Sequence, residues 1–128
     1  MKLLSASLLA VALLAGCGGM KTADMPDAPT RTADGVLVGP NGMTLYTFAK
    51  DSVDSGKSAC IAGCAANWPP LMAPEAAKPR GGYTVIARDD GKNQWAYKGS
   101  PLYYWAKDTK AGDKTGDGVG GNWKLARP

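Results

Sequence analysis

The sequence contains no histidine, one phenylalanine and a single glutamate among its 128 residues. Without histidine there is no Ser–His or Cys–His pair to activate a nucleophile, and no imidazole to bind a metal ion. No Gly-x-Ser-x-Gly motif is present, and Glu75 lies among the prolines and alanines of a single short segment. We therefore expect no enzymatic activity, no catalytic residue, no metal site and no cofactor.

The sequence also lacks a strong charge of either sign. Fifteen lysines and arginines face eleven acidic residues, for a formal net charge of +4. The basic residues are scattered singly along the chain, whereas nucleic-acid binding requires a basic patch that follows the phosphates. We expect no nucleic-acid partner.

A single long apolar run is present, from Leu3 to Leu14, after the positive start Met1-Lys2. The run is shorter than the roughly 20 residues that a membrane-spanning helix needs, so it predicts a signal peptide over residues 1–16. The segment Leu14-Ala15-Gly16-Cys17 resembles the lipobox of bacterial lipoproteins, in which lipid is attached to the cysteine after cleavage before it. An ordinary secretory signal with an incidental cysteine is the alternative.

Lipidation of Cys17 would make the membrane a partner and place the protein outside the cytoplasm. Gly18 after Cys17 resembles the signal for outer-membrane sorting, which for a Gram-negative host implies the periplasmic face or the surface of the outer membrane. Residues 17–33 contain no aromatic side chain and two prolines, so we expect a flexible tether. Residues 34–128 are predicted to form one small domain.

A ten-residue segment occurs twice in this domain. Residues 42–51 return as residues 99–108, and both copies carry the pattern Leu-Tyr-x-[Phe/Trp]-Ala-Lys-Asp. Asp-Gly precedes each copy and Asn-Trp follows it, which gives repeats at about 34–68 and 90–123 with a proline-rich crossover at 69–82. The two copies together are expected to form the folding unit.

The pattern of β-forming residues and turn signals predicts an all-β, or mostly β, domain. We expect two pseudo-equivalent antiparallel meanders, with one short helical or loop segment around a cysteine pair at 59–67. No regular element is expected in the crossover. The predicted strands are 36–38, 43–48, 83–88, 93–97, 102–106 and 123–126, with turns at 89–92 and 99–101 and a glycine-rich loop at 108–121.

These features resemble a bacterial family of secreted or lipoprotein repeats with the motif Tyr-x-[Phe/Trp/Tyr]-x-x-Asp. The resemblance runs from about Asp34 to the C-terminus and includes both motif copies, Cys-x3-Cys-x3-Trp-Pro-Pro and Arg88-Asp89-Asp90-Gly91. It implies an exported location and a regular repeated fold. The family carries no assigned biochemical activity.

The repeated motif has two interpretations. Each aspartate follows its strand, so its carboxylate is expected to accept hydrogen bonds from the backbone of the next turn. Alternatively, the two motif copies meet across a pseudo-twofold axis and line a groove for a sugar, a peptide or an organic cation. A hydrolase using Asp51 and Asp108 is a further alternative. The candidate groove residues are Tyr46, Phe48, Asp51, Tyr103, Trp105 and Asp108.

Cys60 and Cys64 remain as an even pair once Cys17 carries lipid, which predicts a disulfide in an oxidising compartment. A redox or copper-handling role is the alternative, because Cys-x3-Cys also occurs in copper-delivery proteins. A copper site would need a third ligand, for which Met43 and Met72 are the candidates.

The glycine-rich loop at Asp113 to Gly118 imitates the first half of a calcium-binding loop. Its twelfth position is Lys124, where a bidentate glutamate is required, so weak cation binding at Asp113 and Asp117 stays open. Taken together, the sequence predicts a lipid-anchored protein of the bacterial cell envelope. We expect it to act as a non-catalytic binding or structural module, with an envelope glycan, peptide or protein as its partner.

Overall fold

The computed structural model describes residues 29–128, and the predicted signal peptide, Cys17 and most of the tether lie outside this range. The described chain is built mostly from short strands, which confirms the predicted fold class. Within residues 29–128 the one α-helix, α1, is short: it begins just after Cys60 and contains Cys64. The elements are β1 (Arg31–Ala33), β2 (Val36–Val38), β3 (Tyr46–Phe48), α1 (Gly63–Asn67), β4 (Met72–Ala73), β5 (Tyr83–Ala87), β6 (Asn93–Tyr97), β7 (Ser100–Pro101), the 3-10 helix η3 (Val119–Gly121) and β8 (Trp123–Leu125).

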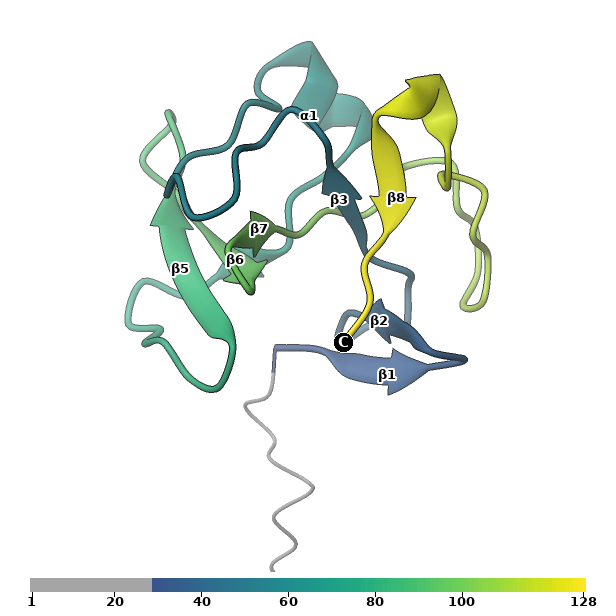
Figure 1. The fold of residues 1–128 in the computed structure, drawn as a ribbon, viewed down its shortest axis with the longest axis horizontal. Coiled ribbons are helices and arrows are strands. Elements are labelled where there is room, and N and C mark those ends of the chain that lie inside the picture. Colours follow the sequence, from purple (N-terminus) through teal and green to yellow (C-terminus); the bar gives the residue numbers. More distant parts are fainter. Residues whose placement is uncertain (1–28) are drawn as a thin grey trace, which may run out of the picture.

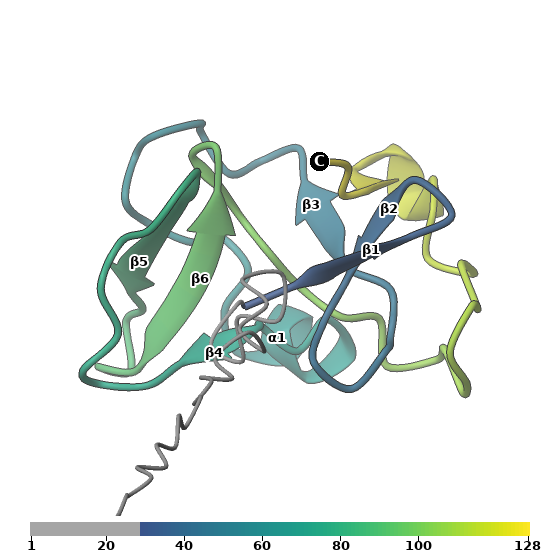
Figure 2. The same cartoon turned by 90° about the horizontal axis from the view of Figure 1, so that it is seen from below.

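Each repeat opens with a β-hairpin, and the two hairpins lie on opposite sides of the domain (Figures 1 and 2). The strands β1 and β2 pair antiparallel, as do β5 and β6. Asp34 and Gly35 join the first pair with φ values of 54° and 76°. A two-residue turn with both φ values positive matches the right-handed twist of the strands, which explains the Asp-Gly sequence at this position.

The repeats exchange their C-terminal segments. The strand β8 from repeat two pairs with β3 of repeat one, and β4 from repeat one pairs with β6 of repeat two. In Figure 1, β8 lies beside β3 although the two strands are far apart in the sequence. Neither repeat therefore completes its own sheet, because each one supplies the strand that the other needs.

The backbone hydrogen bonds show that the exchange is symmetric. The amide of Leu71 donates to the carbonyl of Leu102 at 2.9 Å, and the amide of Ala126 donates to that of Leu45 at the same distance. On the pseudo-twofold axis, Tyr46 and Tyr103 bond each other through both backbone groups, at 2.7 and 3.0 Å. The two copies of the motif thus meet through their tyrosines.

Two clusters of buried side chains form the core. The first contains the leucines that take part in the exchange, together with Ala73, Trp95 and Ala126. The second is largely aromatic and surrounds the axis, with Cys60 and Cys64 packed into it. The aromatic residues of the motif therefore lie at the junction of the two repeats.

The predicted element boundaries differ from the structure at several places. Residues 31–33, predicted as tether, form β1, and Met72-Ala73 in the predicted crossover loop form β4. The hairpin turn lies at Lys98-Gly99, with φ values of 50° and 85°, so residues 100–101 form β7 instead of a turn. Within residues 102–106 only Tyr103 forms isolated bridges, to Tyr46 and Pro70, instead of a strand. On one side the neighbouring segment contains Pro69 and Pro70, which have no amide hydrogen to donate.

Candidate functional site

The motif tyrosines and aspartates form two reciprocal pairs across the repeats. The hydroxyl of Tyr46 donates to Oδ2 of Asp108 at 2.7 Å, and the hydroxyl of Tyr103 donates to Oδ2 of Asp51 at 2.6 Å. Both tyrosines have no exposed surface and both aspartates are 8% exposed. Each tyrosine is thus bonded to the aspartate of the other repeat.

The second oxygen of each carboxylate holds the loop that follows it. Oδ1 of Asp51 accepts the amide of Ala59 at 2.6 Å. Oδ1 of Asp108 accepts the amide and the hydroxyl of Thr115, at 3.0 and 2.6 Å. The two loops differ completely in sequence, yet in each one a backbone amide donates to Oδ1 of the preceding motif aspartate.

Burial alters the ionisation of this centre. It raises the pKa of Tyr46 and of Tyr103 well above the ordinary value of 10.0, and the hydrogen bond from each phenol to its carboxylate raises the pKa further. Burial also raises the pKa of Asp51, and the hydrogen bond from Tyr103, the amide of Ala59 and the charge of Arg88 offset part of this effect. The phenols therefore stay protonated and act as permanent donors.

Four aromatic rings are stacked across the axis, in the order Phe48, Trp123, Trp68, Trp105. Their centroids are 4.3, 3.7 and 4.0 Å apart. The edges of Tyr46 and Tyr103 meet the inner two rings at 5.4 and 5.2 Å. Stacked and edge-to-face pairs of this kind are worth about 0.5–1.5 kcal/mol each beyond the area they bury.

This geometry contradicts the groove hypothesis. The structure does bring the two motif copies together at the axis, but it buries Tyr46, Tyr103, Asp51 and Asp108 and bonds them to one another. Phe48 and Trp105 are half-buried at the two ends of the stack. The two aspartates of the hydrolase alternative lie in the same buried centre, where the oxygens of both carboxylates already accept hydrogen bonds.

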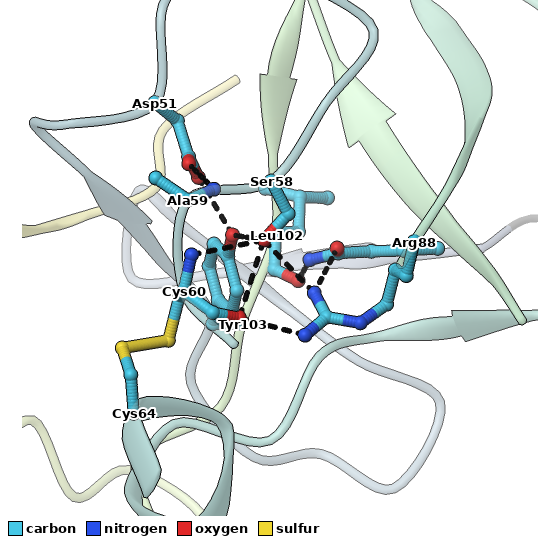
Figure 3. Close-up of a disulfide and its surroundings, with 9 residues drawn as sticks. Asp51, Ser58, Ala59, Cys60, Cys64, Arg88, Leu102 and Tyr103 are labelled. Carbon is cyan, nitrogen blue, oxygen red and sulfur yellow. Dashed lines mark hydrogen bonds between the residues drawn. A yellow bond between two sulfur atoms is a disulfide. The ribbon is translucent and has the colours of Figure 1, made fainter. Parts of the chain in front are cut away.

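The predicted disulfide is present between Cys60 and Cys64, with Cα atoms 5.1 Å apart. Figure 3 shows that the buried guanidinium of Arg88 points toward Cys60 from the side away from the disulfide. This group donates to the carbonyl of Cys60 at 2.6 Å and to Oε1 of Gln94 at 2.8 Å. The disulfide loop is thus bonded to the second repeat.

The disulfide leaves neither sulfur as a thiolate, so the copper hypothesis concerns only the reduced protein. Among residues 29–128 no three His, Cys, Asp or Glu side chains are grouped to hold a metal ion. Asp113 accepts hydrogen bonds from the ammonium of Lys110 and from two backbone amides, and these bonds lower the pKa of its carboxyl group. Asp117 accepts a hydrogen bond from the amide of Leu125. Both carboxylates of the calcium-like loop are therefore engaged within the chain.

A pocket of about 790 Å³ lies outside the repeated motif. Its volume is in the range typical of small-molecule sites. Met72 and Trp95 come from the sheet, Ala76 and Ala77 from the crossover, and Lys78 and Arg80 supply positive charge. The remaining lining residues are four prolines: Pro29, Pro40, Pro74 and Pro79.

A second hollow of about 500 Å³ lies beside the disulfide loop, between Ile61 and Asp89-Asp90. Sequence reasoning missed both hollows. The sequence predicts only a surface connection for the crossover. The signal available is its composition: four prolines between residues 69 and 80, together with Lys78 and Arg80 on either side of the last proline, in a chain with few clustered charges.

Comparison with known proteins gives one match. A family model described as a secreted repeat of unknown function matches the chain twice, at residues 29–72 and 84–127. The matched segments include β1 and the exchanged segment after Trp68, so each repeat is longer than predicted at both ends. No curated protein and no solved structure matches the chain.

Proposed function

The chain belongs to the family of secreted repeats of unknown function, and from this premise we propose a lipid-anchored module of the cell envelope that binds a ligand without catalysing a reaction. The observation that carries the proposal is the reciprocal burial of the Tyr–Asp pairs. The hydroxyls of both motif tyrosines and the carboxylates of both motif aspartates have structural partners. In this proposal the doubled unit is therefore a scaffold, and binding falls to the segments that differ between its halves.

The proline-lined pocket is the binding site in this proposal. It is the larger of the two hollows, and the crossover that forms one of its walls occurs once between the repeats. Its largely apolar lining with a few cationic groups is typical of sites for small molecules or for parts of a larger partner. An envelope glycan, peptide or protein is the general class of ligand.

Attachment to the membrane is the second part of the proposal. No helix within residues 29–128 is long and apolar enough to cross a bilayer. Cys17 follows a lipobox-like segment, and the stretch from Cys17 to Pro29 spans at most about 42 Å when fully extended. Lipid on Cys17 would hold the domain close to the bilayer surface.

The anchor is tested by expressing the full chain and its Cys17→Ser variant in a bacterial host and separating detergent-phase from aqueous-phase proteins. The wild-type chain is expected in the detergent phase, with the mass of attached lipid, and the variant in the aqueous phase. A wild-type chain that is processed but carries no lipid mass would refute the anchor and leave the secreted module standing.

The binding site is tested by nuclear magnetic resonance on the ¹⁵N-labelled chain from residue 17 with Cys17→Ser. Peptidoglycan fragments, stem peptides and soluble lipids are added separately, and the signals of Ala76, Ala77, Lys78 and the Trp95 indole are followed. A ligand of this pocket shifts these signals and not those of η3. Shifts confined to other regions would show that binding occurs elsewhere.

A further inference from the structure

We infer that the proline-lined pocket binds an anionic phospholipid of the membrane that holds the protein, with an acyl chain between the pocket walls and the headgroup at Lys78. This inference rests on the proposed function and names the ligand of the same site.

The lining selects for an apolar ligand. Prolines, alanines, Met72 and Trp95 make up most of the surface, and no carboxylate or carboxamide side chain is among the lining residues. A sugar presents many hydroxyl groups, which need such partners when they leave water. An acyl chain needs none, and its burial is favourable in proportion to the apolar area removed from water.

The charge at the rim selects for an anion. Lys78 is exposed and has no ion-pair partner among residues 29–128. Arg80 adds a second cationic side chain at the pocket. Glu75 lies in the same crossover but is not among the lining residues. A phosphate headgroup at this rim lies near positive charge, and no acidic side chain lines the pocket.

The pocket is built from stiff parts. Trp95 is 7% exposed in β6, and its amide donates to the carbonyl of Leu71 at 2.9 Å. The prolines of the opposite wall have fixed φ angles. A preformed cavity loses little conformational entropy when a ligand enters, which favours binding of a flexible chain.

An added peptide strand is a poorer occupant. The strand β4 lies at the edge of its sheet and contributes Met72 to the pocket, but it is only two residues long. Pro70 and Pro74 flank it, and prolines at an edge strand block pairing with another chain.

The position of the pocket favours a lipid from the surrounding membrane. Pro29, the first described residue, lines the pocket, so the chain leads from this face of the domain towards Cys17. An anchor within about 42 Å of this face allows it to reach the bilayer and raises the effective concentration of lipid at the pocket.

The test uses the chain from residue 17 with Cys17→Ser, so that it does not depend on the anchor. Short-chain phosphatidylglycerol, the matching phosphatidylcholine and a free fatty acid of equal chain length are titrated separately, each below its micelle concentration. Phosphatidylglycerol is expected to shift the signals of Ala76, Ala77 and the Trp95 indole at lower concentration than the other two ligands. Sedimentation with vesicles of phosphatidylcholine, with and without phosphatidylglycerol, then tests the bilayer as the source.

Two variants with matched controls locate the interaction. Lys78→Gln is expected to weaken phosphatidylglycerol binding about fivefold, whereas Lys124→Gln on β8 leaves it unchanged. Ala76→Trp fills the pocket and is expected to abolish binding, whereas Ala66→Trp on α1 does not; circular dichroism establishes that each variant is folded.

The inference is overturned if phosphatidylglycerol and phosphatidylcholine bind equally, if Ala76→Trp binds normally, or if the free fatty acid binds as tightly as the phospholipid. A peptide or glycan that shifts the pocket signals while lipids do not would overturn the inference and retain the proposed binding module. Binding of phosphatidylglycerol together with absence of lipid on Cys17 in the full chain would refute the anchor and leave this inference standing.

Discussion

The reciprocal Tyr–Asp pairs predict which residues are energetically coupled. Tyr103→Phe removes a buried hydrogen bond to the carboxylate of Asp51, and Tyr46→Phe removes the equivalent bond to Asp108. A hydrogen bond to a charged group is worth roughly 1.5–3 kcal/mol, so each substitution should lower the free energy of unfolding by about 2 kcal/mol. In a domain of this size the loss corresponds to a fall in Tm of about 10 °C.

Pseudo-symmetry makes the prediction stricter. Each hydroxyl also contacts further polar groups. The amide of Gly116 donates to Tyr46 at 3.1 Å, and the hydroxyl of Tyr103 lies 2.6 Å from that of Ser58 and also bonds the side chain of Gln94. The two substitutions should therefore agree to within about 1 kcal/mol. Tyr97→Phe is the control, because Tyr97 is half-buried and its hydroxyl has no hydrogen-bond partner among the described residues.

Double-mutant cycles identify the partners. In urea unfolding, Tyr103→Phe combined with Asp51→Ala should show a coupling energy of about 1.5 kcal/mol, as should Tyr46→Phe combined with Asp108→Ala. The pairs within one repeat, Tyr46 with Asp51 and Tyr103 with Asp108, should be additive to within about 0.5 kcal/mol. Coupling within a repeat and additivity across the repeats would refute the exchanged arrangement.

Three further predictions follow from the same structure. When the two halves, residues 29–81 and 82–128, are expressed separately, each should lack near-ultraviolet circular dichroism. The signal should return when the halves are mixed, because each half supplies a strand to the other. A single half that folds alone would contradict this prediction. The free energy of unfolding should fall as the pH rises above 10, and Tyr46 and Tyr103 should ionise only on unfolding. Their pKa values are raised in the folded state, so the stabilisation that they contribute is complete below the unfolded pKa of about 10 and is lost above it. Tyrosinate absorbance that rises before unfolding for all five tyrosines would disprove this prediction. Gly116→Ala should cost about 1–3 kcal/mol in thermal unfolding, since its Cβ would lie 2.9 Å from atoms of Trp68, Trp105 and Tyr46, whereas Gly63→Ala, with open space around it, should not destabilise the domain.

The sequence was sufficient to predict the fold class, the doubled unit and the disulfide. These features depend on local signals, namely alternating apolar residues, Asp-Gly turns and the spacing of the cysteines. It did not predict that β8 pairs with β3 or that Tyr46 bonds to Asp108, because a pair of residues 62 positions apart leaves no mark in local periodicity. The identical motif would equally permit pairing within each repeat.

The pocket escaped prediction for a related reason. Exchange of the segments after Trp68 and Trp123 makes the two halves equivalent up to Leu71 and Ala126. The crossover then has to carry the chain from β4 to β5, and within residues 29–128 this connection occurs once. Its prolines Pro74 and Pro79 line the same pocket as Met72 and Trp95. A binding site formed in this way should take one ligand per domain, so phosphatidylglycerol should titrate to a stoichiometry near one, and a stoichiometry of two would place binding on the repeated scaffold instead.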